Sequence, residues 1–276
     1  MSIQYLTLRE LQQVYFELLQ EFDQICREND LRYDLCGGSM LGAVRHQGYI
    51  PWDDDADVSL PRPAYEELKK RYLNGTLKLP AHRDLVMEDN HTFPRHFMRY
   101  IRYDVKRDAA YAEEDDCPYI GLDIFTVDGL PSDEKECQRH LEKIQKYRRM
   151  LVLAQSKPGT SSRGKLVALA KDLVRPVLKA YGSYRLVNTL ENLCKKYDYD
   201  TAEYVGIANG MYGMKERWLK KDMEPQIMFK FESGEFPGYL NYDIYLSNLY
   251  GNYMELPPEE KQIPHCDPAY FIEPEK

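Results

Sequence analysis

The sequence predicts an α/β (α+β) protein in which a mixed sheet is flanked by helices and followed by a helical and irregular C-terminal part. Three observations support this fold class. Apolar residues near the N-terminus recur every three or four positions, the period of an amphipathic helix. Short apolar or alternating runs between residues 31 and 127 are typical of strands. Beyond residue 130 the helical period returns.

The N-terminal segment has clear helix signals. Thr7-Leu8-Arg9-Glu10 is a capping box, in which the threonine and glutamate side chains bond backbone N–H groups at the helix start. Asn29-Asp30 is expected to end this helix. Its buried stripe is predicted to consist of Leu8, Leu11, Tyr15, Leu18, Phe22 and Ile25.

A strand, a glycine turn and a second strand follow. Residues 31–35 alternate as a strand that enters Gly37-Gly38-Ser39, where Ser39 is predicted to cap a short helix over 40–46. The loop 47–52 leads to an acidic run and a strand that stops at Pro61. The other predicted elements are a helix from Pro63, strands over 85–87, 97–103 and 119–127, a turn at Asp128-Gly129, helices over 132–153, 163–181, 183–197 and 241–250, and a connector over 155–163.

The connector is the natural place to divide the chain. Residues 1–155 are expected to form a core that contains the sheet. Residues 156–276 are expected to form the helical and irregular part, which folds back and completes the site.

Composition restricts the function. The 276 residues carry a net charge of −8, which argues against a general nucleic-acid surface, so an anionic substrate would need local help from metal or arginine. The six cysteines include no Cys-x-x-Cys pair, so we expect buried free thiols rather than zinc or disulfides. Because no apolar run reaches about 18 residues, we expect a cytoplasmic protein without a membrane span.

The most informative segment is an acidic run that turns into a strand. It contains Asp53, Asp54, Asp55 and Asp57, which repel one another unless a cation lies among them. Alternate strand residues face one side, so Asp55 and Asp57 should project together. With Gly37-Gly38-Ser39 nearby, they suit a divalent metal and a phosphate. For Asp53 and Asp54, a capping, loop or supporting role is as well founded as direct ligation.

Asp123 is the best candidate for a third acid. It is a lone charge inside the apolar run 121–127, and a charge there is rarely buried without a partner. Membership of the metal site is one interpretation, and an edge position or a structural pair with an arginine is the other. Asp128 is more simply the aspartate of an Asp-Gly turn.

Glycine and arginine residues complete the candidate phosphate site. Glycine allows close backbone approach, and a helix N-terminus offers N–H donors. Arg45 either caps the end of the short helix or reaches a phosphate. Arg99 and Arg102 are three positions apart and should face opposite sides of a strand, so at most one serves the site.

Three segments together resemble the LicD family of phosphocholine transferases. They are residues 33–58, which hold the glycine turn and the acidic run, residues 121–129, and the ending 250–261. The resemblance spans almost the whole chain. The family is similar in fold to the nucleotidyltransferases and includes the fukutin-type transferases, so it implies a nucleotidyltransferase-like catalytic core over 1–155.

The resemblance also implies a reaction. A CDP-activated alcohol, typically CDP-choline, would give its phospho-alcohol to a sugar hydroxyl of a cell-surface glycan such as lipopolysaccharide or teichoic acid, and CMP would leave. The implied donor site contains Gly37, Gly38 and Ser39, while Asp55 and Asp57 would hold Mg²⁺ or Mn²⁺. Asp123 would orient or deprotonate the acceptor, a glycan or lipid-linked saccharide. A peripheral contact with the inner face of the membrane is compatible with this scheme.

Two further features concern specificity. Tyr49 and Trp52 flank the acidic run and could hold a quaternary ammonium on their aromatic faces, and Trp52 is our candidate for donor binding. Donors with uncharged polyols would not need them. His265 stands where the family would have an adjacent histidine pair, which puts its role in doubt.

Three other functions share parts of this sequence pattern. A calcium loop needs glycine and glutamate where Val58 and Ala64 stand, which argues against it. An Asp-x-Asp glycosyltransferase that uses a nucleotide-sugar remains open, as does a nucleotidyl transferase.

Overall fold

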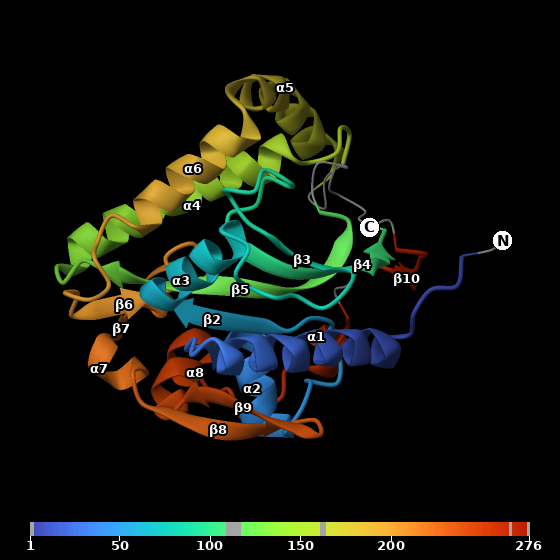
Figure 1. The fold of residues 1–276 in the computed structure, drawn as a ribbon. Coiled ribbons are helices and arrows are strands. Elements are labelled where there is room, and N and C mark those ends of the chain that lie inside the picture. The colour runs from blue at the N-terminus through green and yellow to red at the C-terminus, as the bar shows by residue number, and fades with distance from the viewer. Residues whose placement is uncertain (1–2, 109–116, 161–163, 265–266, 275–276) are drawn as a thin grey trace.

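The computed structural model describes residues 3–108, 117–160, 164–264 and 267–274, and it shows a curled mixed sheet flanked by helices (Figure 1). The predicted fold class is therefore confirmed. The helices are α1 (Leu8–Glu28), α2 (Gly37–His46), α3 (Arg62–Leu73), α4 (Glu134–Ala154), α5 (Lys165–Tyr181), α6 (Ser183–Cys194), α7 (Lys220–Met223) and α8 (Tyr242–Tyr250), with 3-10 turns η1 (Gly213–Glu216) and η2 (Glu259–Lys261). The strands are β1 (Asp34–Leu35), β2 (Asp57–Pro61), β3 (Arg83–Val86), β4 (Met98–Arg107), β5 (Tyr119–Leu130), β6 (Tyr204–Gly206), β7 (Trp218–Leu219), β8 (Gln226–Phe231), β9 (Gly234–Tyr239) and β10 (Ala269–Phe271).

The main sheet has the order β1-β2-β5-β4-β10, and β3, β6 and β7 pair at its sides. Strands β2 and β5 run parallel, whereas β4 and β5 run antiparallel. Strands β8 and β9 form a separate hairpin. Strands β6, β7 and β10 come from beyond residue 155, so the later part of the chain contributes to the same sheet. The division into two parts at residue 155 stays a prediction.

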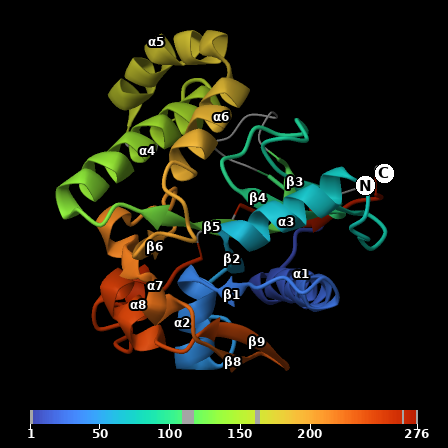
Figure 2. The ribbon, with the colours of Figure 1, turned by 60° about the vertical axis from the view of Figure 1, so that its left-hand side comes forward.

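Helices lie on both sides of strand β2, and Figure 2 shows these two groups apart. Helices α1 and α3 pack on the central strands, and α4, α5 and α6 form a stack beyond them. Helix α2 lies with α8 and the β8–β9 hairpin on the other side of β2. One apolar core joins α1, the central strands and α8, and a second lies among α4, α5 and α6.

The local signals at the N-terminus are confirmed. Thr7 and Glu10 make both bonds of the capping box, and Asn29 caps the end of α1. The predicted strand over 31–35 is shorter than expected, because only Asp34 and Leu35 pair with β2. The other predicted helices and strands are present with small changes in their ends.

The prediction that Ser39 caps the short helix is wrong. Helix α2 begins three residues earlier than predicted, at Gly37, and Cys36 occupies the cap position. The Ser39 hydroxyl instead accepts a hydrogen bond from the Asp57 backbone N–H at 2.8 Å. The serine therefore ties α2 to the start of β2, which is a tertiary contact that local sequence does not reveal.

The predicted turn at Asp128-Gly129 is also wrong. Strand β5 continues to Leu130, and Asp128 pairs in register with Gly206 of β6. The Asp128 carboxylate is buried and accepts a hydrogen bond from Arg62 Nε at 2.7 Å. An ion pair and a partner strand from the distant part of the chain override the usual turn chemistry.

Two predictions about composition can be compared with the structure. The five cysteines that the structure describes are free and buried, as expected, and Cys266 lies outside the described residues. Among the described helices, none has both the length and the apolarity that crossing a bilayer requires.

Candidate active site

Three charged residues lie in one row across the middle of the sheet. Asp57 at the start of β2 is the register partner of Asp123 on β5, and Asp123 is the partner of Arg99 on β4. Directly paired residues of neighbouring strands project on one face. The predicted acids of the first and second motifs are thus brought together.

The glycine turn closes on these acids. Gly37 has a φ of +52°, which favours glycine, and a Cβ there would lie 3.4 Å from a carboxylate oxygen of Asp57. A Cβ on Gly38 would lie 2.7 Å from a carboxylate oxygen of Asp53, closer than real Cβ atoms approach. The Gly37 N–H donates to the Tyr245 hydroxyl at 2.8 Å. The start of α2 therefore fits against the acidic run only because it lacks side chains.

A cavity of about 270 Å³ contains this arrangement. Its lining includes Gly37, Gly38, Asp55, Asp57 and Asp123, so five of the predicted site residues share one space. The lining also includes aromatic and apolar side chains from β5, α8, the loop before η1 and Phe97 just before β4. A pocket that combines an acidic floor, a helix N-terminus and aromatic walls can hold a ligand with phosphates and an organic group.

The carboxylates are electrostatically strained. Desolvation, then repulsion from Asp53, Asp54 and Asp123, raises the pKa of Asp55 well above its usual value. The pKa of Asp57 is raised in the same direction, by desolvation and then chiefly by Asp55 and Asp123. Because the Asp55 side chain is exposed, repulsion from the other acids matters more than burial at that residue. A cation at this place would relieve the repulsion.

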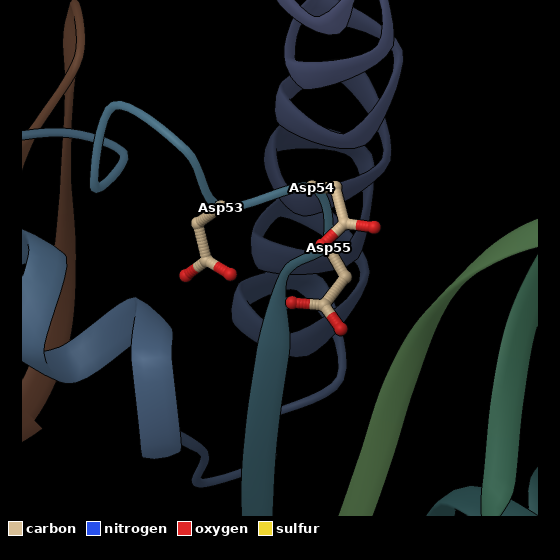
Figure 3. A group of neighbouring side chains, drawn as sticks. All are labelled: Asp53, Asp54 and Asp55. Atoms are coloured by element: carbon tan, nitrogen blue, oxygen red, sulfur yellow. The ribbon is translucent and has the colours of Figure 1, made fainter. Parts of the chain in front are cut away.

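The acidic run also supplies a group with metal-binding geometry. One carboxylate oxygen from each of Asp53, Asp54 and Asp55 lies within 4.8 Å of the others, along the loop that enters β2 (Figure 3). Oxygen ligands of this kind suit Mg²⁺ and Mn²⁺. Asp55 belongs both to this group and to the cavity, so it is the residue through which the two sets of carboxylates meet.

Arg99 is the cationic partner of the row. It is buried, and its Nε donates to Asp123 Oδ1. Burial is the largest single influence and would lower the pKa of Arg99, but the charge of Asp123, the hydrogen bond to it and smaller contributions from other groups together raise the pKa. Arg102 instead pairs with Asp104 and Glu17 away from the row, so only one of these two arginines serves the site, as the strand period predicts.

Three predicted donor-binding residues are placed differently from the rest. Ser39 is buried and bonds Asp57 through its hydroxyl, and Arg45 donates to the Tyr253 carbonyl at 2.7 Å. Trp52 packs edge-on against His46, with ring centroids 6.4 Å apart. None of the three lines the cavity, and their roles in binding a donor stay predictions.

Sequence reasoning missed several residues that line the cavity. Glu216 is buried, and desolvation raises its pKa to about 7. Its Oε1 accepts from the Tyr212 N–H at 3.1 Å, while its Oε2 has no hydrogen-bond partner. The rings of Tyr212 and Tyr250 meet edge to face at 5.7 Å. Tyr250 begins one of the segments that resemble the family, but nothing in the sequence pointed to Glu216 or Tyr212.

The comparisons with known proteins first indicate a general class of protein. Residues 30–120 match the family model of the LicD/FKTN/FKRP nucleotidyltransferase domain. The match includes the glycine turn and the acidic run and ends before Asp123. Together with the sheet and its row of acids, the match indicates that this part of the chain is similar to a nucleotidyltransferase domain of this type.

Comparison with individual proteins indicates a more specific group of relatives. The chain is 29% identical over 275 residues to the lipopolysaccharide cholinephosphotransferase LicD of Haemophilus influenzae, with 97% of this chain and 99% of the relative covered. Uncharacterized proteins of Rickettsia prowazekii and Rickettsia typhi are 40% identical over 45 residues, which is 16% of this chain and 17% or 15% of theirs. The resemblance to the LicD family is thereby confirmed.

Proposed function

We propose that this protein transfers phosphocholine from a CDP-activated donor to a sugar hydroxyl of a cell-surface glycan and releases CMP. The observation that carries the proposal is the cavity in which Asp55, Asp57 and Asp123 face the start of α2. The relative from Haemophilus influenzae, aligned over nearly its whole length, supports phosphocholine as the group and lipopolysaccharide as the kind of acceptor. Because the donor is a nucleotide, we also propose that the protein acts in the cytoplasm, at the inner face of the membrane.

The donor phosphates would lie against the backbone at Gly38 and Ser39. The first N–H groups of a helix have no acceptor within the helix, and the helix dipole favours an anion there. Asp55 and Asp57, with Asp123 beside them, fit Mg²⁺ because they are crowded oxygen ligands whose charges repel. A bound ion would supply positive charge next to the departing CMP.

Asp123 would act on the acceptor in this scheme. Its carboxylate would accept the proton of the sugar hydroxyl as the hydroxyl oxygen bonds to the phosphorus of phosphocholine and the bond to CMP breaks. Arg99 holds this carboxylate in the row of acids and faces it from β4. Arg99 therefore acts as a positioning residue in this scheme.

The choline group would lie against the aromatic wall. Tyr212 and Tyr250 both line the cavity, and the Glu216 carboxylate accepts a hydrogen bond from the Tyr212 backbone N–H. Each aromatic face contributes about 0.5–2 kcal/mol to binding of a quaternary ammonium. By contrast, the Tyr49 ring is buried against Phe231 and does not line the cavity.

The decisive experiment is a donor panel on the purified protein. CDP-choline, CDP-glycerol, CDP-ribitol, UDP-sugars and ATP are incubated with a glycan acceptor, with and without Mg²⁺, and the released nucleotide is identified. Release of CMP from CDP-choline, dependent on metal and acceptor, is expected. Release of pyrophosphate from a nucleoside triphosphate would indicate a nucleotidyl transferase, and release of UDP would indicate a glycosyltransferase. Either result would overturn the proposal.

A pair of variants tests the position of the choline. Tyr212→Leu should reduce the preference for CDP-choline over CDP-ribitol by about tenfold, the equivalent of about 1.4 kcal/mol. Trp52→Leu serves as the matched control, because Trp52 is aromatic and close to the acidic run but lies outside the cavity. If Trp52→Leu changes the preference and Tyr212→Leu does not, the ammonium lies at the acidic loop, where the sequence first suggested it.

A further inference from the structure

Helix α5 presents its apolar side chains to solvent. Leu166, Leu169, Leu173 and Val177 recur at spacings of three and four and lie on one face of the helix. Their exposed fractions are 85%, 62%, 74% and 68%. A row of exposed leucines is unusual on a water-facing helix and indicates a surface that another phase or molecule covers.

The polar side of α5 is the side that faces the protein. Asp172 is half-buried and accepts a hydrogen bond from the Gly159 N–H at 2.9 Å. Arg175 is also half-buried and donates to the Ser156 carbonyl. Ala168 and Leu178 are the buried apolar residues of this helix. The helix therefore packs on the protein through its polar face and its two buried apolar residues. An amphipathic helix usually packs through its apolar face, so the orientation of α5 is reversed.

The charges on α5 are also unlike those of the chain as a whole. The helix carries Lys165, Lys171, Arg175 and Lys179 against a single acid, Asp172, whereas the net charge of the protein is −8. In Figures 1 and 2 the helix lies at one extremity of the molecule, on the stack formed with α4 and α6. A basic helix with an outward apolar face complements an anionic lipid surface.

We propose that the apolar face of α5 binds the surface of an anionic lipid bilayer, with Lys165 and Lys179 at its border near the head groups. The exposed Lys165 and Lys179 and the proline at position 176 make it a helix that lies in the interface rather than one that crosses. A second copy of the chain fits less well, because pairing two α5 faces would bring like charges together. This inference goes beyond the proposed transferase reaction and does not depend on it.

The test is sedimentation of the full chain with vesicles. Wild-type protein should bind vesicles that contain about 30% phosphatidylglycerol in phosphatidylcholine, bind weakly to phosphatidylcholine alone, and be partly released by about 0.5 M salt. The double variant Leu169→Gln/Leu173→Gln should lower the partition coefficient by about tenfold or more, because two exposed leucines lose their apolar contact. Equal binding of wild type and this variant would overturn the proposal.

Two further measurements make the result specific. Ile227→Gln/Met228→Gln on β8 is the matched control, since these exposed apolar residues lie at the opposite end of the molecule, and it should bind vesicles like wild type. Leu173→Trp should show a blue shift of its additional emission with anionic vesicles. An equal loss in the control, no shift at position 173, or a wild-type dimer that Leu169→Gln/Leu173→Gln converts to a monomer would each refute the bilayer assignment.

Discussion

The Arg99–Asp123 pair offers a way to separate chemistry from structure at this site. Both side chains are largely buried, at 9% and 15% exposure, and Arg99 Nε donates to Asp123. Asp123→Asn keeps an oxygen acceptor but removes the charge. Removing one partner of a buried ion pair costs about 3–5 kcal/mol. Asp123 also raises the pKa of Asp55 and Asp57, so its loss relieves repulsion, which we put at about 1 kcal/mol.

We therefore expect Asp123→Asn to lower the free energy of unfolding by about 2–4 kcal/mol. Urea denaturation without metal measures this change. The double variant Arg99→Met/Asp123→Asn should recover most of the stability, because no unpaired buried charge remains. The coupling between the two substitutions follows from the double-mutant cycle.

Activity of the same variants distinguishes the two interpretations of Asp123. If its carboxylate acts on the acceptor, transfer stays very slow in both Asp123→Asn and the stable double variant, while binding of CDP-choline by titration calorimetry changes little. If the double variant recovers both stability and transfer, Asp123 is only the structural partner of Arg99. An Asp123→Asn protein as stable as wild type would refute the assigned cost of breaking the pair.

Three other outcomes follow from the site and its surroundings. Asp57→Asn should abolish transfer. In the absence of metal it should nevertheless raise the free energy of unfolding, because desolvation and repulsion disfavour the charged carboxylate at this position. Urea denaturation in the presence of a chelator measures the direction of this change, and a loss of stability would count against the prediction. Gly38→Val should weaken CDP-choline binding by about tenfold, or about 1.4 kcal/mol, because even a Cβ at this position would meet the Asp53 carboxylate. Unchanged affinity in titration calorimetry would argue that the donor binds elsewhere. Burial raises the pKa of Asp128 to about 7 from an ordinary 3.8 and outweighs Arg62, whose charge lowers it, so the ion pair with Arg62 is fully charged only above about pH 7. Between these two pKa values the native carboxyl group holds a proton that the unfolded chain has lost. The unfolding free energy of wild type relative to Asp128→Asn should therefore decline as the pH rises from about 4 to about 7, and a flat difference would contradict this.

The features that sequence predicted well depend on short-range rules. The capping box at Thr7, the stripe of α1 and the strand after Asp57 follow from neighbouring residues and their period. The proximity of Asp57 and Asp123 was predicted from their chemistry. The register of β2 and β5 places them together because both strands are buried and a shift of one residue would turn every side chain over.

The features that sequence did not predict depend on distant segments. Ser39 was expected to cap α2, but its hydroxyl is taken by Asp57 eighteen positions away. Asp128 carries a turn signal that β6 and Arg62 override. Glu216 and Tyr212 reach the cavity from a loop whose position is set by the short β6–β7 pair. No local pattern marks such residues, because their neighbours in space are far away in the sequence.

The arrangement of charges explains how an acidic site persists in this fold. Several carboxylates near β2 raise one another's pKa, which is unfavourable for the native state at neutral pH. Arg99 offsets part of this cost from β4, and Ser39 fixes the backbone of Asp57 so that the strand cannot move away from α2. The remaining repulsion is the property that would make a divalent ion bind, because only an added cation lets all the acids stay charged and close together. The strain in the native chain and the proposed chemistry thus have one physical origin.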